Sequence, residues 1–551
     1  MEHDTRVEWR AWGSAAFDEA TEFGTPLLCS IVTSWCGPCA EMDETTYRDP
    51  PIAAIVNDAF VPVRVDAERR PRVRDRYNAG GFPSTVVLAP DGSILDAATY
   101  LEPDEMRDFL DRALARHEEW SENPDVTESP EPDTPPSGEL DSLIVSRLYG
   151  VLDATYDDVH GGWGDSPKFP VPSAIEFCLG RDTSMACESL DAIADSLFDD
   201  LNGGFYRFAH ERDWTDLQRE KRLEDTAALV RAFANAYLHT GSERYRQTAA
   251  RSIEYLCTTL WVESNEGADR PTGGFASSQL ARDGEIGPSN GVAPDGYPVD
   301  ETVYAGANAL AIDALLTFAA YTDDRRAKRC ARTALESLRS EMMPGGVVDH
   351  VLFESDSPRC LLFDQARTLR ALLTAHSVLG TESLEDARSV ADVTIDRLRD
   401  GASFVDGPTE HVDKRSRPLR PIEGNAELAN ALFELSVLTD DDRYRTVGRS
   451  ALEAFAGITD GIGVNVATYA DTVGRYIDDP LVVRVGSDAW SDLHRASLRL
   501  ADHRKIVVPN DDSVPRGTAR VERGTVHSER ADSPAELAAR VREVATDESE
   551  R

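Results

Sequence analysis

Two cysteines that stand three positions apart are the residues of this 551-residue chain best suited to chemistry. Cys36 and Cys39 lie in the run Trp35-Cys36-Gly37-Pro38-Cys39. Outside a disulfide framework, a CxxC pair is typical of redox chemistry or of metal binding. No second pair of Cys or His ligands stands nearby in the sequence, so we expect redox chemistry and no metal site.

The other six cysteines are too widely spaced to form a disulfide framework. Cys29 lies in an apolar run and is expected to act as a small buried residue. The six are Cys29, Cys178, Cys187, Cys257, Cys330 and Cys360.

The segments around the CxxC pair predict a small α/β domain. Residues 26–34 form an apolar run fit for a buried strand, and residues 39–47 continue with helical character. Cys36 would then stand at a strand-to-helix junction, where the amides of the helix N-terminus favour a thiolate. Strands alternating with helices, followed by an antiparallel pair, complete the pattern. The further segments are a strand over 60–67, a helix over 71–79, a hairpin turning at Asp91-Gly92 and a helix over 102–117.

These motifs resemble the thioredoxin family over about 90 residues. The run around the cysteines is similar to the family's active site, and the stretch GGFPSTV, 80–86, is similar to its second signature. The resemblance implies that Cys36 is the nucleophile and Cys39 the resolving thiol. It also implies that Pro83 is a cis-proline facing the disulfide. Trp35, Gly37 and Pro38 are then the supporting residues of the site.

One position departs from the thioredoxin pattern. Thioredoxins usually have a buried aspartate six residues before the first cysteine, and here that position is Ser30. The departure predicts altered proton handling at Cys39. The alternative is a thioredoxin fold retained only for packing.

The rest of the chain predicts three further segments. Residues 119–139 are rich in Pro, Glu and Ser and predict an extended acidic linker after the 1–118 domain. Residues 140–479 show long segments with apolar residues at i, i+3 and i+4, which are typical of amphipathic helices. Residues 480–551 predict strands and helices of a small C-terminal α/β lobe, without a dinucleotide-binding glycine pattern.

A helical hairpin followed by a glycine-rich stretch recurs about six times in the helical body. Such self-similarity indicates a repeat architecture. An open solenoid is one solution, but we expect closure into an (α/α)6 toroid, because aromatic glycine-rich connections suit the mouth of a closed ring. The stretches are 160–165, 202–208, 272–278, 344–350, 401–407 and 460–469.

Together the two parts resemble the family of spermatogenesis-associated protein 20 and its microbial relatives. The stretch GDSPKFP around Lys168 and the stretch GGFYRF around Phe205 carry the resemblance most specifically. It implies a thioredoxin-like domain joined to an (α/α)6 toroid similar to N-acylglucosamine 2-epimerases and six-hairpin glycosidases. The residues that match the family by type are Glu220, Lys221, Asp225, Asn308, Asp364, Gly424 and Asn425.

Acidic residues near the starts of the predicted helices have two interpretations. Carboxylates stabilise helix N-termini, so helix capping alone would explain them. Alternatively, carboxylates gathered at the mouth of a toroid could do general acid–base chemistry on a sugar. The candidates are Glu224, Asp225, Asp300, Glu301, Asp364 and Glu423, and His160, His210, His350 and His411 lie in or beside the glycine-rich stretches as cavity or ordinary loop residues.

Two departures from the family bear on the choice of function. Gln218 and Tyr206 stand where the family usually has histidines, which weakens an epimerase reading because epimerisation needs paired acid and base groups. Many members also have a histidine-flanked CxxC, whereas this chain keeps Gly37 and Pro38 between its cysteines. Both observations favour redox function.

The amino-acid composition indicates which classes of binding partner to expect. The formal net charge is −41, and only five of the 58 basic residues are lysines. This resembles proteins of salt-accumulating halophiles, where a Debye length of about 3 Å at 1 M salt suppresses self-repulsion. An acidic surface repels nucleic acid. The N-terminus lacks a signal-peptide pattern, and no apolar run approaches the roughly 20 residues of a membrane span, so we expect a cytoplasmic protein without membrane partners.

The sequence therefore favours a thiol–disulfide oxidoreductase without a cofactor. Its expected substrate is a disulfide-bearing protein or a small thiol, bound or oriented by the toroid. One alternative is a carbohydrate-active toroid, resembling an epimerase or glycosidase, with an accessory thioredoxin domain and a sugar as its ligand. A second alternative is a non-catalytic binding scaffold.

Overall fold

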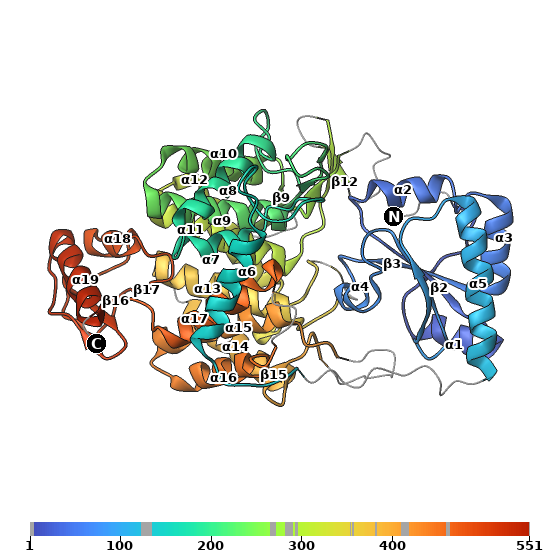
Figure 1. Cartoon of the computed structure of the whole chain (residues 1–551). Helices are drawn as coiled ribbons and strands as arrows, with labels where there is room; N and C mark the ends of the chain where they lie inside the picture. The colour runs from blue at the N-terminus through green and yellow to red at the C-terminus, as the bar shows by residue number, and fades with distance from the viewer. Residues whose placement is uncertain are drawn as a thin grey trace. The chain divides into compact units, whose positions relative to one another are not determined.

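The computed structural model describes most of the chain and divides it into two compact units. Unit 1 comprises Met1–Thr134, Leu280–Gly291 and Gly407–Leu419, and unit 2 comprises the remainder. Figure 1 shows the first of these stretches in blue. His411 lies outside the described residues. The described residues are 5–122, 135–264, 272–281, 290–292, 296–352, 354, 357–380, 383–408, 418–458 and 463–549.

Unit 1 is built on a five-stranded sheet with the order β1–β3–β2–β4–β5. Strands β1, β3 and β2 run parallel to one another. Strand β4 runs antiparallel to β2, and β5 runs antiparallel to β4. Cys29 on the central strand β2 pairs with Val63 of β3 on one side and with Val86 of β4 on the other. The strands are β1 (Arg10–Ala11), β2 (Leu27–Val32), β3 (Val61–Asp66), β4 (Ser84–Leu88) and β5 (Ile94–Ala98).

Helices cover both faces of this sheet, which explains why β2 is apolar throughout. Leu28 packs with residues of α3 and α5 on one face, whereas Cys29 and Ile31 pack with residues of α1 and α4 on the other. Successive side chains of a strand point to opposite faces, so an uninterrupted apolar run serves both cores. The helices are α1 (Ser14–Phe23), α2 (Gly37–Glu44), α3 (Pro50–Ala59), α4 (Pro71–Tyr77) and α5 (Pro103–Glu122).

Unit 2 contains a closed ring of six inner helices, each of which contacts the next. Six outer helices pair with them (Figure 1). The inner helices are α7 (Pro172–Leu179), α9 (Leu223–Thr240), α11 (Ala305–Thr322), α13 (Leu362–Leu379), α15 (Ile422–Thr439) and α17 (Ala467–Ile477). The outer helices are α6 (Ser142–Thr155), α8 (Thr183–Ser196), α10 (Glu243–Thr258), α12 (Arg325–Glu341), α14 (Ser383–Leu398) and α16 (Asp442–Glu453).

The ring closes through helices that are far apart in the sequence. α17 contacts both α7 and α6, so the sixth hairpin joins the last inner helix to the first helix of the unit. The expected (α/α)6 toroid is confirmed. Its sixth pair is not consecutive in sequence, a feature that the repeat pattern did not predict.

Sequence pattern decides which helix of a pair is inner. α11 is apolar on nearly all sides and is buried almost throughout, as expected for a helix with neighbours all round. Its partner α12 buries one stripe, which includes Ala327, Ala331 and Leu338, and exposes its charged face.

Short strands connect the helices: β6 (Phe208–Ala209), β7 (Leu217–Gln218), β8 (Lys221–Arg222), β9 (Trp261–Ser264), β10 (Thr272–Phe275), β11 (Ser278–Gln279), β12 (Asn290–Val292), β13 (Pro298–Asp300), β14 (Arg399–Asp400) and β15 (Ser403–Phe404).

The C-terminal lobe is the small α/β structure that the sequence predicts. Its sheet has the order β17–β16–β18–β19, with β16 and β17 parallel. The hydroxyl of Ser533 accepts a hydrogen bond from the Glu536 amide, as expected for a helix cap. The elements are β16 (Val482–Val485), α18 (Asp492–Leu498), β17 (Ile506–Val508), β18 (Ala519–Arg523), β19 (Val526–His527) and α19 (Pro534–Ser549).

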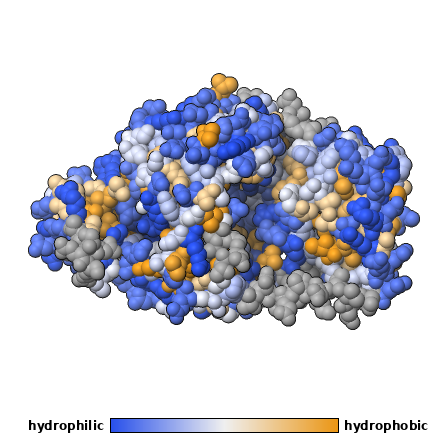
Figure 2. Space-filling model, in the orientation of Figure 1, coloured by the Kyte–Doolittle hydropathy of each residue, from blue (hydrophilic) through white to orange (hydrophobic). Residues whose placement is uncertain are grey.

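The surface is strongly polar. Figure 2 shows hydrophilic residues over most of the visible face, with small and scattered apolar patches. Within the described ranges, no helix is long and apolar enough to cross a membrane.

Candidate functional site

The CxxC pair stands where strand β2 gives way to helix α2. Cys36 is the N-cap of α2, and its Sγ accepts a hydrogen bond from the Cys39 amide at 3.1 Å. The two sulfurs are joined in a disulfide with an S–S distance of 2.06 Å. Cys36 is 6% exposed and Cys39 3% exposed, so both residues are buried. The expected strand-to-helix junction is thus present.

Aromatic side chains surround the pair. The ring of Trp35 meets that of Phe82 edge to face, with 5.7 Å between centroids. Val32 completes the apolar cluster of the two cysteines and Trp35. The peptide bond between Phe82 and Pro83 is cis.

A buried carboxylate lies one helical turn after Cys39, and sequence reasoning missed it. Asp43 is 1% exposed and accepts two hydrogen bonds from Nη2 of Arg64, at 2.7 and 2.6 Å. Arg64 is the β3 residue paired with Ser30 on β2. The aspartate that thioredoxins usually place on this strand is absent, but Asp43 on α2 supplies a carboxylate on the same side of the sheet. Burial raises the pKa of the neighbouring Cys29 thiol, so Cys29 remains protonated.

The side chain of Lys221 is 3% exposed and binds a turn that precedes helix α9. Its Nζ donates to Oδ2 of Asp199 at 2.6 Å and to the Gly203 carbonyl at 2.9 Å. The other oxygen of Asp199 accepts the amides of Leu201 and Asn202, which closes the turn before the glycine pair.

Lys168 makes an equivalent pair with an aspartate. Its Nζ donates to Asp157 at 2.6 Å, and Asp157 accepts the amides of Val159 and His160. Two of the five lysines therefore hold equivalent turns, DDVHGGW and DDLNGGF.

Asn308 and Asn425 also make backbone contacts that are equivalent to each other. The side chain of Asn308 accepts the Phe275 amide at 2.7 Å and donates to the Phe275 carbonyl at 3.0 Å. The side chain of Asn425 does the same for Phe404, at 2.8 and 2.9 Å. Each asparagine is the fourth residue of its inner helix, so each ties a glycine-rich strand to the ring. These hydrogen bonds give both asparagines a structural role in the fold.

The predicted carboxylates do not all gather at one point. Asp300 accepts the Thr302 amide and hydroxyl, at 3.1 and 2.7 Å, within its own turn. Glu301 is exposed. Asp364 is 3% exposed and accepts the Gly306 amide at 3.0 Å and Nδ1 of His350 at 2.8 Å.

Glu220 and Asp225 do lie together, at the start of α9. Burial raises the pKa of Glu220, and the nearby charge of Asp225 adds to the rise. A hydrogen bond from Gln218 at 2.6 Å acts in the opposite direction. Gln218 in turn contacts Nε2 of His210 at 3.1 Å. Burial also raises the pKa of Asp225, against the effect of Arg222.

A third carboxyl group with a raised pKa lies at the start of α15. Burial and the charge of Glu427 raise the pKa of Glu423 to about 7, against the effect of Arg367. Arg367 of α13 joins helices α9 and α15, with Nη1 2.8 Å from Glu224 and Nε 3.1 Å from Glu427.

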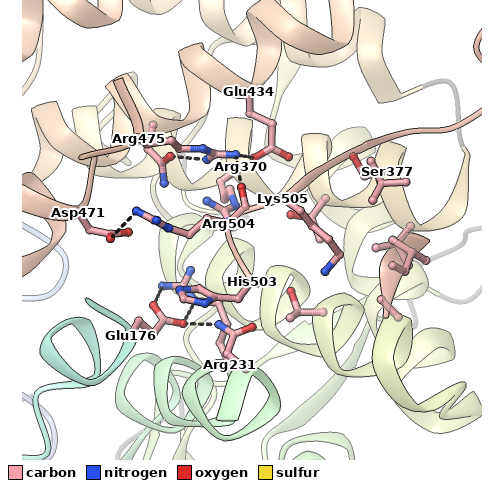
Figure 3. A pocket seen from close by; sticks show the side chains of 18 of the residues that line it. Glu176, Arg231, Arg370, Ser377, Glu434, Asp471, Arg475, His503, Arg504 and Lys505 are labelled. Atoms are coloured by element: carbon pink, nitrogen blue, oxygen red, sulfur yellow. Dashed lines mark hydrogen bonds and ion pairs between the residues drawn. The ribbon is translucent and has the colours of Figure 1, made fainter. Parts of the chain in front are cut away.

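The interior of the ring contains a cavity of about 150 Å³ that sequence reasoning missed. Figure 3 shows its charged walls, with Glu434, Arg475 and Arg370 on one side and Glu176, Arg231 and His503 on the other. The available signal was the presence of lone charged residues inside otherwise apolar helices, such as Asp313 in α11.

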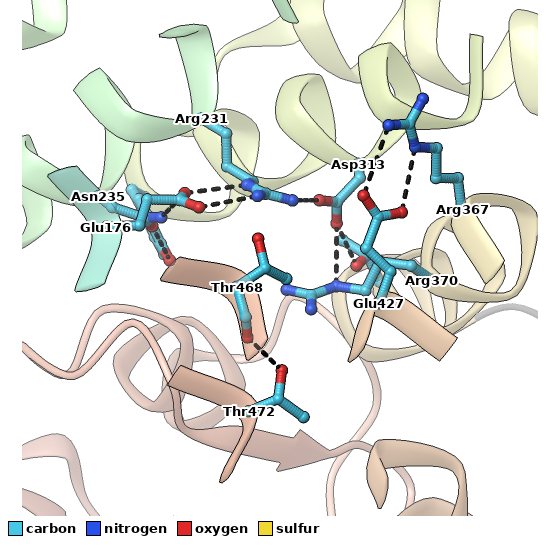
Figure 4. A network of polar contacts seen from close by, with 11 residues as sticks. Glu176, Arg231, Asn235, Asp313, Arg367, Arg370, Glu427, Thr468 and Thr472 are labelled. Carbon is cyan, nitrogen blue, oxygen red and sulfur yellow. Dashed lines mark hydrogen bonds and ion pairs between the residues drawn. The ribbon is translucent and has the colours of Figure 1, made fainter. Parts of the chain in front are cut away.

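A polar network runs beside this cavity (Figure 4). Arg231 lies between Glu176 and Asp313, with distances of 2.7 and 3.0 Å. Arg370 approaches Asp313 at 3.5 Å. Arg231 and Asp313 come from neighbouring inner helices and Glu176 from a third, so the network links α7, α9, α11 and α13. Within the described part of the chain, no group of three or more His, Cys, Asp or Glu side chains is placed to hold a metal ion.

Comparisons with known proteins match both parts of the chain. Residues 1–131 match the family model Thioredox_DsbH, described as a protein of unknown function, DUF255. Human spermatogenesis-associated protein 20 is 28% identical over 329 residues, which cover 52% of this chain and 40% of that protein. An uncharacterized protein of Caenorhabditis elegans is 27% identical over 309 residues. The matches thus span well under two thirds of the length of these relatives.

Solved structures are also similar to part of the chain. Cellobiose 2-epimerase from Spirochaeta thermophila is 19% identical with a TM-score of 0.42, covering 56% of this chain and 83% of that one. A D-mannose isomerase is 13% identical with a TM-score of 0.48, covering 61% of this chain and 97% of that one. The resemblance found in the sequence is confirmed: the chain is similar to spermatogenesis-associated protein 20 over half of its length, and its N-terminal residues match the DUF255 family.

Proposed function

We propose that the N-terminal domain catalyses thiol–disulfide exchange through Cys36 and Cys39. The observation that carries the proposal is the position of Cys36 at the N-cap of α2, where its Sγ accepts the Cys39 amide at 3.1 Å. A helix N-terminus stabilises negative charge, and the thiolate is the nucleophilic form of cysteine.

The reaction needs only the two cysteines and a disulfide substrate. The Cys36 thiolate attacks one sulfur of the substrate, the substrate disulfide breaks, and the second substrate sulfur leaves as a thiolate that takes up a proton. The Cys39 thiolate then attacks Cys36, releases the first substrate thiol and forms the Cys36–Cys39 disulfide. Two electrons pass from the protein to the substrate. A dithiol donor restores the reduced pair by the same steps in reverse.

The helical ring would bind or orient the partner. In this proposal the partner is a disulfide-bearing protein or a small thiol, and no further cofactor takes part. The acidic surface favours partners that are not themselves strongly acidic.

The test is turnover of a disulfide substrate with dithiothreitol as donor, using insulin as the probe. We expect Cys36→Ser to abolish catalysis. Cys39→Ser should accumulate a mixed disulfide that is visible by mass spectrometry. Cys187→Ser, which changes a free cysteine in the ring, serves as the matched control and should retain activity. Undiminished activity of Cys36→Ser would refute the proposal.

A second candidate function is acid–base chemistry on a sugar at the start of the inner helices. It is favoured by Glu423, whose pKa burial and Glu427 raise to about 7, because a carboxyl group poised near neutral pH suits a general acid. Glu220 and Asp225 are further candidates with raised pKa values. A panel of aldoses and disaccharides, followed by NMR, tests this candidate. Turnover that Glu423→Gln abolishes and Cys36→Ser leaves unchanged would support it, and absence of turnover across the panel would count against it.

A further inference from the structure

The cavity inside the ring is separate from the carboxyl groups at the start of the inner helices. It lies along the second halves of helices such as α9, α11 and α13. All six inner helices contribute to its lining, including Glu176, Arg231, Tyr321, Arg370, Glu434 and Arg475. The residues His503, Arg504 and Lys505, which precede strand β17 of the C-terminal lobe, complete it (Figure 3).

Positive charge prevails in this lining, although the chain as a whole carries a formal charge of −41. The carboxylates that line the cavity are Glu176, Glu434 and Asp471, and the cationic side chains are Arg231, Arg370, Arg475, Arg504 and Lys505. Burial lowers the pKa of His503 to about 4, so its imidazole is neutral at pH 7.

Two of the three carboxylates are hydrogen-bonded to arginines: Glu176 to Arg231 of the lining, and Asp471 to Arg181 outside it. Glu176 accepts hydrogen bonds from Arg231 at 2.9 and 2.7 Å and from Asn235 at 2.9 Å. Asp471 accepts a hydrogen bond from Arg181 at 2.9 Å, whereas Arg504 lies 3.7 Å away from it.

Three of the other four cations approach a carboxylate only at 3.5–3.7 Å. Glu434 lies 3.6 Å from Nη2 of Arg475, Asp313 lies 3.5 Å from Nε of Arg370, and Asp471 lies 3.7 Å from Nη1 of Arg504. Nη1 of Arg475 also donates to the side-chain oxygen of Asn430 at 2.5 Å, and its Nη2 donates to the Arg504 carbonyl at 3.3 Å. Lys505 donates to the backbone carbonyl of Asp502 at 3.0 Å. Buried cations in proteins normally form close pairs with anions, and these ion pairs are longer than a hydrogen-bonded pair.

Several donors in the lining also have no hydrogen-bond partner among the described residues. They are Nε of Arg370, Nε of Arg475 and Nη1 of Arg504. Arg475 is 6% exposed, so bulk water does not satisfy its donor. Buried donors are almost always paired in native proteins, and a cluster of unpaired donors around one cavity indicates a ligand that accepts hydrogen bonds.

Compensation of the helix C-termini does not explain these cations. Cations do stabilise the carbonyl end of a helix. Here, however, α9, α11, α13 and α15 each end in a left-handed residue whose amide binds one of the last carbonyls. Moreover, the arginine donors that lack a partner are not bonded to any of these carbonyls.

We propose that this cavity is a binding site for a small oxyanion, such as a phosphate or a short carboxylate. Guanidinium groups match the geometry of such anions, because their N–H donors pair with the oxygens of one anion. A cavity of about 150 Å³ accommodates a molecule of roughly six heavy atoms, judged by the apolar cavity of that size that takes up benzene.

The ligand would join two parts of unit 2. Arg370 and Arg475 belong to the ring, whereas Arg504 and Lys505 belong to the C-terminal lobe. An anion bound by all four would stabilise the attachment of the lobe to the ring. The proposal is independent of the redox function, since it concerns neither Cys36 nor Cys39.

The test measures binding of inorganic phosphate, and separately of malonate, to the full-length protein at constant chloride concentration. Isothermal titration calorimetry should show one saturable site for at least one of them. The ¹³Cε resonance of Lys505, assigned with Lys505→Arg and resolved easily among five lysines, should shift with the same dissociation constant. Binding of phosphate or of malonate then shows whether the site takes a phosphate or a carboxylate.

Two variants decide whether the cavity is the site. Arg504→Gln should weaken binding at least tenfold, whereas Arg516→Gln, on the exposed surface of the same lobe, should leave it unchanged. The Lys505 resonance of the unaltered protein keeps the test valid if Arg504→Gln does not fold. Absence of both heat and shift at millimolar phosphate and malonate would overturn the proposal. So would an equal Lys505 shift on titration with chloride alone.

Discussion

Nζ of Lys221 lies 2.6 Å from Oδ2 of Asp199, and both side chains are almost fully buried. Burial alone would raise the pKa of Asp199, but the hydrogen bond from Lys221 and the amides of Leu201 and Asn202 outweigh it and lower the pKa to about 2. The pair fixes the turn whose glycines pack against Tyr255, where a Cβ on Gly204 would approach the ring at 2.7 Å. Lys221 thus positions the chain at the entrance to helix α9.

Replacement of Lys221 by methionine should destabilise unit 2 by about 3–5 kcal/mol, because it leaves the buried Asp199 carboxylate without its partner. Urea unfolding followed by circular dichroism measures the change. The double variant Lys221→Met/Asp199→Leu should recover part of the loss. Arg516→Met, in an exposed pair, should change stability by less than about 0.5 kcal/mol. Equal stability of Lys221→Met and the unaltered protein would show that the pair contributes nothing net.

Asn425→Leu should destabilise the ring by about 2–4 kcal/mol, because it leaves the buried amide and carbonyl of Phe404 unpaired. Asn308→Leu should have a similar effect through Phe275. Disulfide reduction by the N-terminal domain should be unchanged in both. Gln247→Ala, at an exposed residue of α10, is the control. A variant that loses sugar binding yet unfolds at the same urea concentration as the unaltered protein would instead indicate a functional asparagine.

Protonation of Glu423 should contribute to the pH dependence of the free energy of unfolding. Its folded-state pKa of about 7 exceeds its ordinary value of 4.5, so the folded protein binds the proton more tightly than the unfolded chain. The resulting stabilisation is complete below pH 4.5 and is lost as the pH rises through 7, by up to about 3 kcal/mol.

Glu423→Gln should flatten this slope between pH 4.5 and 7 in urea titrations. Glu336→Gln, on the exposed face of α12, should preserve the slope. A slope unaffected by Glu423→Gln would mean that Glu423 titrates at its ordinary pKa.

In the reduced protein, iodoacetamide should alkylate Cys36 faster than Cys39. Cys36 has the Cys39 amide directed at its sulfur and a larger exposed fraction, 6% against 3%. Peptide mass spectrometry after short reaction times measures both rates. Cys29, buried in the sheet, should react only after unfolding and serves as the internal control. Faster reaction of Cys39 would reverse the proposed roles of nucleophile and resolving thiol.

Local pattern was sufficient to predict most elements. The apolar run of β2 and the Asp91-Gly92 hairpin define the sheet of unit 1, and the order of strands and helices after residue 480 matches the lobe. These features depend on neighbours in sequence, where periodicity and turn chemistry act directly.

Long-range contacts account for what the sequence did not predict. Asn308 and Asn425 are the family's residue types at the expected places, but their partners Phe275 and Phe404 lie on other elements. The cavity requires six helices and the C-terminal lobe to meet, and its signal in the sequence was charged residues on several inner helices, such as Arg370 in α13. Side chains that share a site across hundreds of residues leave no periodic pattern.

The pairing of α6 with α17 has a consequence for synthesis on the ribosome. α6 ends at Thr155, and its partner begins at Ala467, more than 300 residues later. At translation rates of about 5–20 residues per second, the apolar stripe of α6 waits roughly 15–60 s for its neighbour. The nascent chain therefore needs either a temporary cover for Ile144, Leu148 and Leu152 or protection by a chaperone until the ring closes.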